Sequence, residues 1–402
     1  MKFAHFADCH IGSWRDPKLR GISTEVFIKT IDECIKREVD FVLIAGDLFN
    51  TSLPAIELLK EVVVKLKHLK EAGIPVYIIA GSHDFSPSGK TMLDVLEGAG
   101  LVVNVVKGSV EDGKLKLNFT VDIKTGVKIT GMLGKKGMLD KAYYENLEHS
   151  NLVKEGGYKI FMFHTALTEF KPAEFENMES QPLSLLPKGF NYYAGGHVHY
   201  IFEKDEPEYG KITYPGALFP ANFGELEKYG NGGFYIVTEN NHEWVPISVL
   251  NTFNISVDCD HKTPEQVTHK INSYIEGIEF NNTIVILRVY GTLESGKISD
   301  INFNSIFKSL YDKSAYFVMK NTSGIKTSEF EEVKVAVQDV DKIEELMIKE
   351  HAGKIKVDEM DIDKEKSLVN SLLNILSLDK QEGERVSDFE SRLKQELGGL
   401  LW

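Results

Sequence analysis

Apolar and polar residues repeat with two different periods over residues 1–100. Short apolar runs predict buried strands at residues 2–7, 39–45 and 74–80. Longer stretches with a 3.6-residue apolar period predict helices at residues 24–38, where Ser23 or Thr24 is a suitable N-cap, and at 55–72. Strand, helix and strand in this order indicate right-handed βαβ units, so we expect a parallel sheet.

Between residues 102 and 132 the apolar period shifts toward two, which favours strands joined by tight turns. Turn-forming residues occupy positions 111–113 and 124–126, and we therefore expect hairpins in a second, mixed sheet. Further strands are expected at residues 158–163 and 191–195, with a last pair at 211–214 and 233–237. The pattern closes near residue 250, so residues 1–250 are expected to form the first domain.

The rest of the chain predicts two smaller parts. Residues 251–335 repeat strand and helix signals, and Thr263 with Gln266 forms a capping box around Pro264. We expect a small α/β domain there, which either contacts substrate or partner or has only a structural role. Residues 336–402 are helical and more polar, and they either pack on the first domain or dock a partner. Their three apolar faces are Ile343, Leu346 and Met347; Leu368, Leu372 and Ile375; and Val386, Phe389, Leu393 and Leu397.

Composition narrows the class of protein. A length of 402 residues exceeds one ordinary core, and a hydrophobic content of 42% is normal for a soluble protein. No apolar run approaches the roughly 20 residues of a membrane helix. The amino end turns polar too soon for a signal peptide, so we expect a cytoplasmic protein. Three widely spaced cysteines argue against a disulfide framework and a thiolate zinc site.

The net charge of −14 has the wrong sign for binding nucleic acid by bulk electrostatics. Residues 331–402 carry 18 Asp and Glu against 11 Lys and Arg, a net of −7 and half of the excess. A phosphate substrate must therefore be met by local positive charge or by metal ions.

Candidate metal ligands follow five of the predicted strands. Asp47 stands at the carboxyl end of the second strand, the usual side for ligands in an open α/β sheet. The other four strand ends provide Asp8 and His10; Ser82, His83 and Asp84; His164; and His197 and His199. Oxygen and imidazole donors bind divalent metals. Two metals about 3.5–4 Å apart can activate water and polarise a phosphoester when a carboxylate bridges them, and Asp47 is the candidate bridge.

These motifs resemble a known family. Asp8-x-His10, Gly46-Asp47, Gly81-x-His83-Asp84, His164 and Gly196-His197-x-His199, in this order, match the pattern of calcineurin-like metallophosphoesterases over residues 1–250. The segments FAHFADCHIG at 3–12, IAGDLF at 44–49, YPG at 214–216 and FGE at 223–225 are similar to SbcD-type nucleases of DNA double-strand-break repair. The resemblance implies a four-layer α/β sandwich with two mixed sheets, a small α/β capping domain and a C-terminal helical segment.

The resemblance also implies roles for individual residues. Asp8, His10 and His199 would bind one metal, and His164, His197 and position 82 the other, with Asp47 shared. His83 would protonate the leaving oxygen while Asp84 orients its ring. The family uses manganese. It also implies DNA as substrate, an SMC-like ABC ATPase of the SbcC type docked on the C-terminal helices, and a homodimer formed through helices such as 55–72 and 92–99.

The chain departs from the family pattern at Ser82, where the family has asparagine. A hydroxyl is a shorter and weaker ligand than an amide oxygen, so we expect the second metal to bind less tightly or through water. Cations near the site are candidates for DNA contact: Arg15, Lys18 and Arg20 in the loop after His10, and Lys135 and Lys136 between glycines. A solvated lysine face explains the lysines of residues 107–136 equally well.

We therefore expect a two-metal, manganese-dependent DNA phosphodiesterase, acting as an exonuclease, an endonuclease or both. One alternative is a metallophosphoesterase that acts on cyclic nucleotides or other small phosphodiesters. The other is a weakly active or inactive scaffold subunit of a repair complex, in which Ser82 marks a decayed site.

Overall fold

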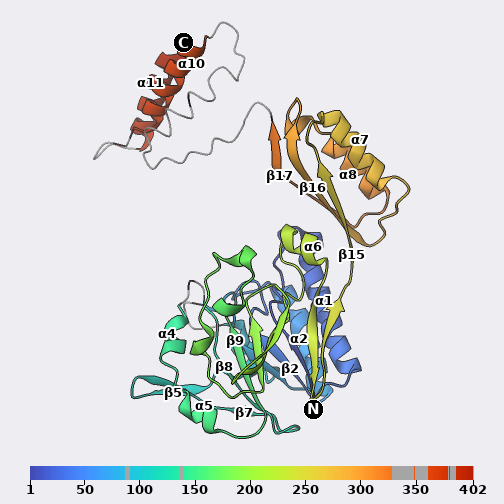
Figure 1. Cartoon of the computed structure of the whole chain (residues 1–402), viewed down its shortest axis with the longest axis vertical. Helices are drawn as coiled ribbons and strands as arrows, with labels where there is room; N and C mark the ends of the chain where they lie inside the picture. The colour runs from blue at the N-terminus through green and yellow to red at the C-terminus, as the bar shows by residue number, and fades with distance from the viewer. Residues whose placement is uncertain are drawn as a thin grey trace. The chain divides into compact units, whose positions relative to one another are not determined.

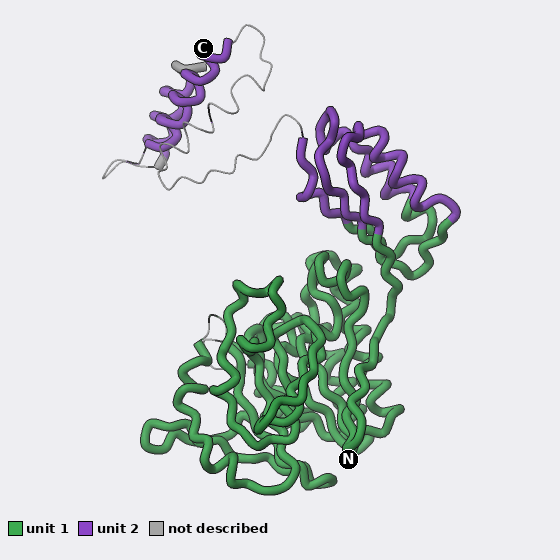
Figure 2. Tube along the Cα trace, viewed as in Figure 1, with its two compact units in different colours: residues 1–254, 278–286, 310–319 green, residues 255–277, 287–309, 320–402 purple. Residues whose placement is uncertain are grey.

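The computed structural model describes residues 1–86, 91–135, 137, 139–327, 348, 361–378, 380 and 386–401 (Figure 1). The chain divides into two compact units (Figure 2). Unit 1 comprises residues 1–254, 278–286 and 310–319, and unit 2 comprises residues 255–277, 287–309 and 320–402. Within the described ranges, no helix combines the length and apolar character needed to cross a membrane.

The first sheet of unit 1 has six strands in the order β14-β13-β1-β2-β3-β4. Its strands are β1 (Lys2–Phe6), β2 (Phe41–Ala45), β3 (Val76–Ile79), β4 (Val103–Asn104), β13 (Gly232–Thr238) and β14 (His242–Ile247). Strands β1 to β4 are parallel, as the βαβ pattern predicts, while β13 and β14 are antiparallel. The sheet is therefore mixed, and its parallel strands end at one edge.

The second sheet has the order β11-β12-β10-β9-β8-β7. Its strands are β7 (Thr120–Val121), β8 (Lys128–Gly131), β9 (Lys159–His164), β10 (Tyr192–Gly196), β11 (Phe202–Glu206) and β12 (Gly210–Tyr214). The four central strands are parallel and the two edge strands antiparallel. Strands β5 (Gly108–Glu111) and β6 (Lys114–Leu117) form a separate hairpin. The predicted last pair thus separates, with β12 in this sheet and β13 in the other.

The two sheets face each other across an apolar core. Phe3, Phe41 and Ile79 of the first sheet pack in one cluster with Ile160 and Tyr192 of the second. Helices α1 (Pro17–Lys36), α2 (Ile56–Glu71) and α3 (Met92–Gly98) cover the outer face of the first sheet. The short helices α4 (Lys141–Glu145) and α5 (Ser150–Lys154) cover the outer face of the second. The expected four-layer sandwich with two mixed sheets is confirmed.

Helix α1 begins earlier than predicted. Asp16 is the N-cap, its carboxylate accepts the backbone N–H of Lys18, and Pro17 occupies the first turn. Ser23 and Thr24, the expected cap, are buried inside the helix. Part of the loop expected after His10 is therefore the first turn of a helix.

Helix α2, one of the helices that the resemblance assigns to a homodimer contact, packs several of its apolar residues on its own unit. Val62, Leu66 and Leu69 are fully buried against the first sheet. Ile56, with 78% of its surface exposed, and Val64, with 43%, are the large apolar residues of α2 that stay accessible.

A three-stranded sheet, β15-β16-β17, follows, and the units divide each of its strands. Its elements are β15 (Asn251–Asp258), α7 (Pro264–Ile275), β16 (Thr283–Leu293), α8 (Phe303–Asp312) and β17 (Phe317–Thr327). The predicted capping box of Thr263 and Gln266 is present at the start of α7. Helices α10 (Ile362–Leu376) and α11 (Val386–Leu401) contact each other. The predicted face of Ile343, Leu346 and Met347 lies outside the described residues.

Candidate metal centre

The polar strand ends of both sheets meet at one place. Asp8, His10, Asp47 and His83 follow parallel strands of the first sheet, and His164 is the last residue of β9 in the second. Three groups of potential ligands have their donor atoms within 4.8 Å of one another. They are Asp8, His10 and His199; His10, Asp47 and His83; and Asp8, Asp47 and His164. Side chains scattered over 190 residues thus form one cluster.

The backbone at these positions is strained. Asp8, His10, Asp47 and His197 have positive φ angles of 51°, 41°, 53° and 84°, a region that residues other than glycine rarely adopt. Such conformations persist where the surroundings impose them, and they concentrate at functional sites. The turns aim these side chains out of the strand direction and into the cluster.

Three glycines let the chain segments approach closely. A Cβ on Gly46 would collide with the ring of His164, and one on Gly81 with the carboxylate of Asp47. A Cβ on Gly196 would collide with the carbonyl oxygen of Ala45. Glycine is required here because the ligands of the two sheets occupy the space that a side chain would fill.

Asp47 lies at the middle of the cluster and is 2% exposed. Its Oδ2 is 3.2 Å from Nε2 of His164 and 3.7 Å from Nε2 of His10. Its Oδ1 accepts the backbone N–H of His83 at 2.7 Å. The hydroxyl of Ser82 is 3.4 Å from Oδ2. Asp47 therefore lies close to ligands that the resemblance assigns to different metals, His10 and His164, and Asp8 does so at slightly longer distances of 3.9 Å.

Burial and neighbouring charge set the protonation of the cluster. Burial raises the pKa of Asp8 to about 7 and lowers the pKa of His10 to about 3 and that of His197 to about 4. Burial also opposes ionisation of Asp47 and His164, but their mutual attraction outweighs it, helped by the backbone N–H of His83 at Asp47 and the carbonyl oxygen of Ala45 at His164. The pKa of Asp47 falls well below its usual range, and that of His164 rises to about 10. Asp47 and His164 are therefore favoured as an ion pair at the middle of the cluster.

Two histidine rings are oriented by hydrogen bonds at Nδ1, the nitrogen that faces away from the cluster. Nδ1 of His164 is 2.7 Å from the carbonyl oxygen of Ala45, and Nδ1 of His199 is 2.9 Å from Oε1 of Glu225 on α6 (Phe223–Tyr229). A histidine that donates its Nδ1–H outward presents Nε2 as the ligand atom, the arrangement found around protein-bound metals. Glu225 had no assigned role in the sequence interpretation.

The donor atoms suit divalent metal ions. Nε2 of His10 and Nε2 of His199 face each other at 3.1 Å. Nε2 of His164 is buried and makes no hydrogen bond of acceptable geometry. Ring nitrogens that converge with carboxylate oxygens in a buried space are explained by a shared cation, which accepts the lone pairs of all of them.

His83 and Asp84 are positioned differently from the expectation. Nδ1 of His83 lies 2.8 Å from the carbonyl oxygen of Asn50, so a backbone group orients this ring. The carboxylate of Asp84 instead accepts backbone N–H groups of Leu48, Phe49 and Gly81 at 3.1–3.2 Å. The reason is local. Asp84 is buried, and these three donors point into the same space.

The donor atoms assigned to the second metal lie less close to one another than those assigned to the first. Asp8, His10 and His199 form one close group, as the resemblance implies. His197 belongs to none of the three groups found among the described residues, although its ring centroid is 5.3 Å from that of His164. Ser82 is 7% exposed and reaches only Asp47 among the ligands.

The candidate DNA-binding cations have different surroundings. Arg20 donates to the carbonyl oxygens of Trp14 and Arg15, and therefore braces the loop. Lys18 lies over the rings of Tyr311 and Tyr316, 5.7 and 5.9 Å from their centroids.

Lys135 lies between two aromatic rings, with its Nζ 4.6 Å from the ring centroid of Phe85 and 4.7 Å from that of Tyr143. Phe85 is two residues after His83 in the chain. Arg15 is exposed, and Lys136 is outside the described residues. The other lysines of this region are paired with acidic groups: Lys107 with Glu97, Lys114 with Glu148, Lys116 with Glu111, Lys124 with Asp40, and Lys128 with Glu155.

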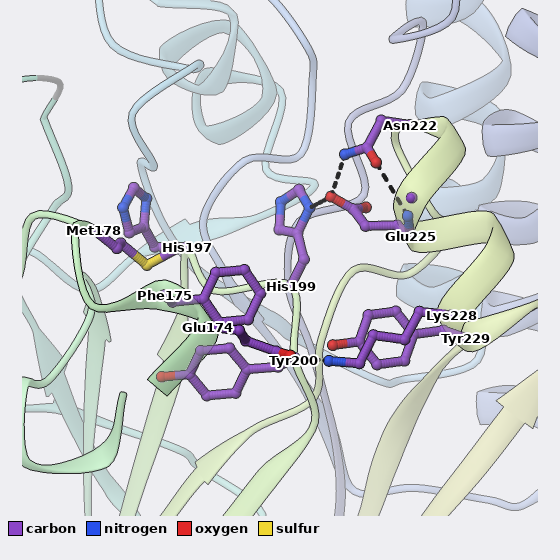
Figure 3. Close-up of a pocket in the computed structure, with 11 residues that line it drawn as sticks. Glu174, Phe175, Met178, His197, His199, Tyr200, Asn222, Glu225, Lys228 and Tyr229 are labelled. Atoms are coloured by element: carbon purple, nitrogen blue, oxygen red, sulfur yellow. Dashed lines mark hydrogen bonds and ion pairs between the residues drawn. The ribbon is translucent and has the colours of Figure 1, made fainter. Parts of the chain in front are cut away.

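A pocket of about 570 Å³ borders the cluster (Figure 3). His197 and His199 form part of its wall, together with Glu225 and the side chains of Phe175, Met178, Tyr200 and Tyr229. Figure 3 shows the hydrogen-bonded chain from His199 through Glu225 to Asn222 at one side of this space. The pocket was not expected from the sequence, because its aromatic residues have no regular spacing.

The part of the chain that holds this cluster is similar to known proteins. Residues 1–200 match the family model described as calcineurin-like phosphoesterase. The chain is similar to archaeal proteins named DNA double-strand break repair protein Mre11. It is 30% identical over 249 residues to that of Methanopyrus kandleri, covering 59% of this chain and 54% of the relative. It is 31% identical over 247 residues to that of Methanococcus maripaludis, covering 59% and 62%.

The chain thus spans between about half and two thirds of the length of these curated relatives. A crystal structure of a dimetal phosphatase from Danio rerio aligns with 62% of this chain and 97% of its own, at 10% identity and a TM-score of 0.39.

Proposed function

Because the chain belongs, through residues 1–200, to the calcineurin-like phosphoesterase family, we propose that it is a two-metal DNA nuclease that acts in double-strand-break repair. One observation carries the proposal. Carboxylate oxygens and ring nitrogens from both sheets converge around Asp47 in a buried cluster. The similarity to archaeal relatives named as DNA double-strand break repair proteins supports DNA as the substrate.

We assign Asp8, His10 and His199 to one divalent cation, and His164, His197 and Ser82 to the other, with Asp47 shared. Mixed oxygen and imidazole donors suit Mn²⁺. When bound, such ions polarise the phosphoryl oxygens and provide a water nucleophile near neutral pH. The two sites are unequal in this proposal, because the hydroxyl of Ser82 is short and already lies 3.4 Å from Oδ2 of Asp47.

His83 protonates the oxygen that leaves the phosphorus. Its Nδ1–H donates to the carbonyl oxygen of Asn50, which keeps the ring in one orientation and leaves Nε2 to carry the transferred proton. The proton at Nε2 passes to the leaving oxygen, and the ring returns to the neutral form with its hydrogen on Nδ1. Asp84 accepts the backbone N–H groups of Leu48 and Gly81. It thereby holds the loop that carries Asp47 next to the loop that carries Ser82 and His83.

Local positive side chains, rather than the net charge of the protein, attract and position the DNA backbone at the site. We propose Arg15 and Lys135 as phosphate contacts, because both belong to segments next to the cluster. The paired lysines of residues 107–128 are poor candidates, since each already has an acidic partner.

We further propose that an SMC-like ABC ATPase of the SbcC type docks on α10 and α11. No described residue of α10 is buried, and Ile362 and Leu376 are 52% and 63% exposed. A homodimer through α2 and α3 is supported by the exposed Ile56, Val64 and Val95. The three-stranded sheet with α7 and α8 is proposed as the capping domain.

The experiment is digestion by the purified full-length chain in Mn²⁺. Linear duplex and single-stranded DNA, cyclic nucleotides and a small chromogenic diester are compared, each with and without a chelator. The proposal predicts DNA cleavage that the chelator abolishes. Hydrolysis of only the small substrates would identify a phosphodiesterase of another class, and the absence of any metal-dependent hydrolysis would identify a scaffold subunit.

A further inference from the structure

The pocket beside the cluster has features that the proposed reaction does not use. We name it the aromatic pocket and define it by Phe175, Met178, Tyr200 and Tyr229. His197 and His199, which the proposed function assigns to the metal centre, also line the aromatic pocket (Figure 3). A group attached to a phosphate bound at that centre therefore extends toward this pocket.

The lining of the aromatic pocket is flat and apolar. The rings of Phe175 and Tyr200 stack with centroids 5.7 Å apart and planes 24° from parallel. The ammonium of Lys228 lies over the ring of Tyr229 at 5.1 Å and over that of Phe175 at 5.8 Å. Such surfaces bind planar π systems through stacking and cation–π contacts.

The charges around the aromatic pocket disfavour a second phosphate there. Its lining includes the carboxylates of Glu174 and Glu225, and one ammonium, that of Lys228. Lys228 already forms an ion pair with Glu174, and both side chains are about half exposed. An anion would meet more negative than positive charge, whereas a neutral aromatic group would not.

From these contacts we infer that the aromatic pocket holds an unpaired nucleobase of the strand that is cut. The inference rests on the proposed function, because it takes the phosphate to be bound at the metal centre. A pocket of about 570 Å³ is within the range of about 300–1,000 Å³ that encloses small organic ligands. A base in a duplex is stacked and paired, so it enters a concave pocket only after leaving the stack. The enzyme therefore acts on single-stranded or frayed ends before it acts on intact duplex.

The test is calorimetric binding of deoxyadenosine monophosphate and of 2-deoxyribose 5-phosphate to the full-length chain in Mn²⁺. Stacking of a base on protein aromatic rings gives an expected preference of roughly five- to a hundredfold for the nucleotide. The variant Phe175→Leu loses most of this preference. The matched control is Phe202→Leu, which removes a ring that also stacks face to face, 5.1 Å from Phe170, but is not part of the aromatic pocket.

Equal affinities of the two ligands for the wild type, or a preference that survives Phe175→Leu, would overturn the inference. The binding measurement does not depend on turnover, so its outcome is separate from that of the proposed function. Base preference without DNA cleavage would leave the aromatic pocket correct and the nuclease proposal wrong. Cleavage of DNA with no base preference in binding would do the reverse.

Discussion

Nδ1 of His199 lies 2.9 Å from Oε1 of Glu225. This contact joins a candidate ligand that follows β10 to the first turn of α6. Glu225 is itself fixed, because its other oxygen accepts the backbone N–H of Ala221 at 2.8 Å. Burial alone would lower the pKa of His199, but the hydrogen bond that its Nδ1–H donates to Glu225 and the charge of Asp8 raise it. We therefore propose Glu225 as a positioning residue for the first of the two proposed metals.

Replacing Glu225 with alanine should weaken Mn²⁺ binding roughly 10- to 100-fold, the usual effect of removing the partner of a ligating histidine. Glu225→Gln should recover part of the loss, because an amide oxygen still accepts from Nδ1. Competition with a fluorescent metal indicator measures the affinity. Glu239→Ala, at a carboxylate that is 70% exposed, is the control. An unchanged affinity in Glu225→Ala would show that the contact does not position His199.

The variant Ser82→Asn should strengthen binding of the second Mn²⁺. An amide oxygen reaches further than the hydroxyl and carries more partial charge, and a gain of about tenfold corresponds to ~1.4 kcal/mol. Titration should then show two tight sites in place of one tight and one weak site, with a faster nuclease rate. Identical titration curves for wild type and variant would refute the unequal-site proposal.

The variant His83→Ala should lower turnover on DNA by about 10²–10⁴-fold while leaving Mn²⁺ affinity within a few fold, because a general acid contributes about this much. A diester with a nitrophenol leaving group needs no proton and should be cleaved almost normally. His83 also belongs to a close group with His10 and Asp47. A parallel loss of metal affinity would therefore assign it as a ligand instead.

A pH effect on stability is expected from His5, which lies outside the cluster between the two sheets. Burial lowers its pKa to about 3, and its Nδ1 is 2.9 Å from the hydroxyl of Tyr192. Since the pKa is lower in the folded state than in the unfolded state, the stabilisation is present above about pH 6.5 and is lost as the pH falls toward 3.

Between pH 7 and pH 5 this loss is about 2 kcal/mol of unfolding free energy. Urea unfolding of the metal-free chain at both pH values measures it. The variant His5→Leu should show a correspondingly smaller decrease, whatever its stability at pH 7. The same decrease in both proteins would mean that His5 does not titrate on unfolding.

Much of the site could be predicted because its ligands stand where strands end. Asp8, Asp47 and His164 follow apolar runs, and parallel strands bring their carboxyl ends to one edge. The convergence of both sheets at Asp47 depends in addition on how the two sheets pack on each other, which the strand order alone does not specify. The predicted βαβ order and both hairpins are present for the same reason, since alternating apolar patterns report directly on burial.

Other parts could not be predicted, for identifiable reasons. Asn50 orients His83 through a carbonyl oxygen, which every residue has, so no sequence signal exists. Asp84 is adjacent to His83 in the chain, but the loop turns its carboxylate toward backbone N–H groups. Glu225 acts from a helix of seven residues whose position depends on packing. The edge strand β11, FEKDE, was missed because four of its five residues are charged, and β14, HEWVPI, because it begins with two polar residues and contains a proline.

We propose above all that Asp47 is a ligand shared by two metal ions on which DNA cleavage depends. It is tested most directly by Mn²⁺-dependent cleavage of single-stranded and duplex DNA by the wild-type chain and by Asp47→Asn, which keeps the size of the side chain and removes its charge. We predict metal-dependent cleavage by the wild type and a rate reduced at least a thousandfold, roughly 4 kcal/mol, in the variant. Comparable cleavage by both proteins, or none by the wild type, would contradict the account.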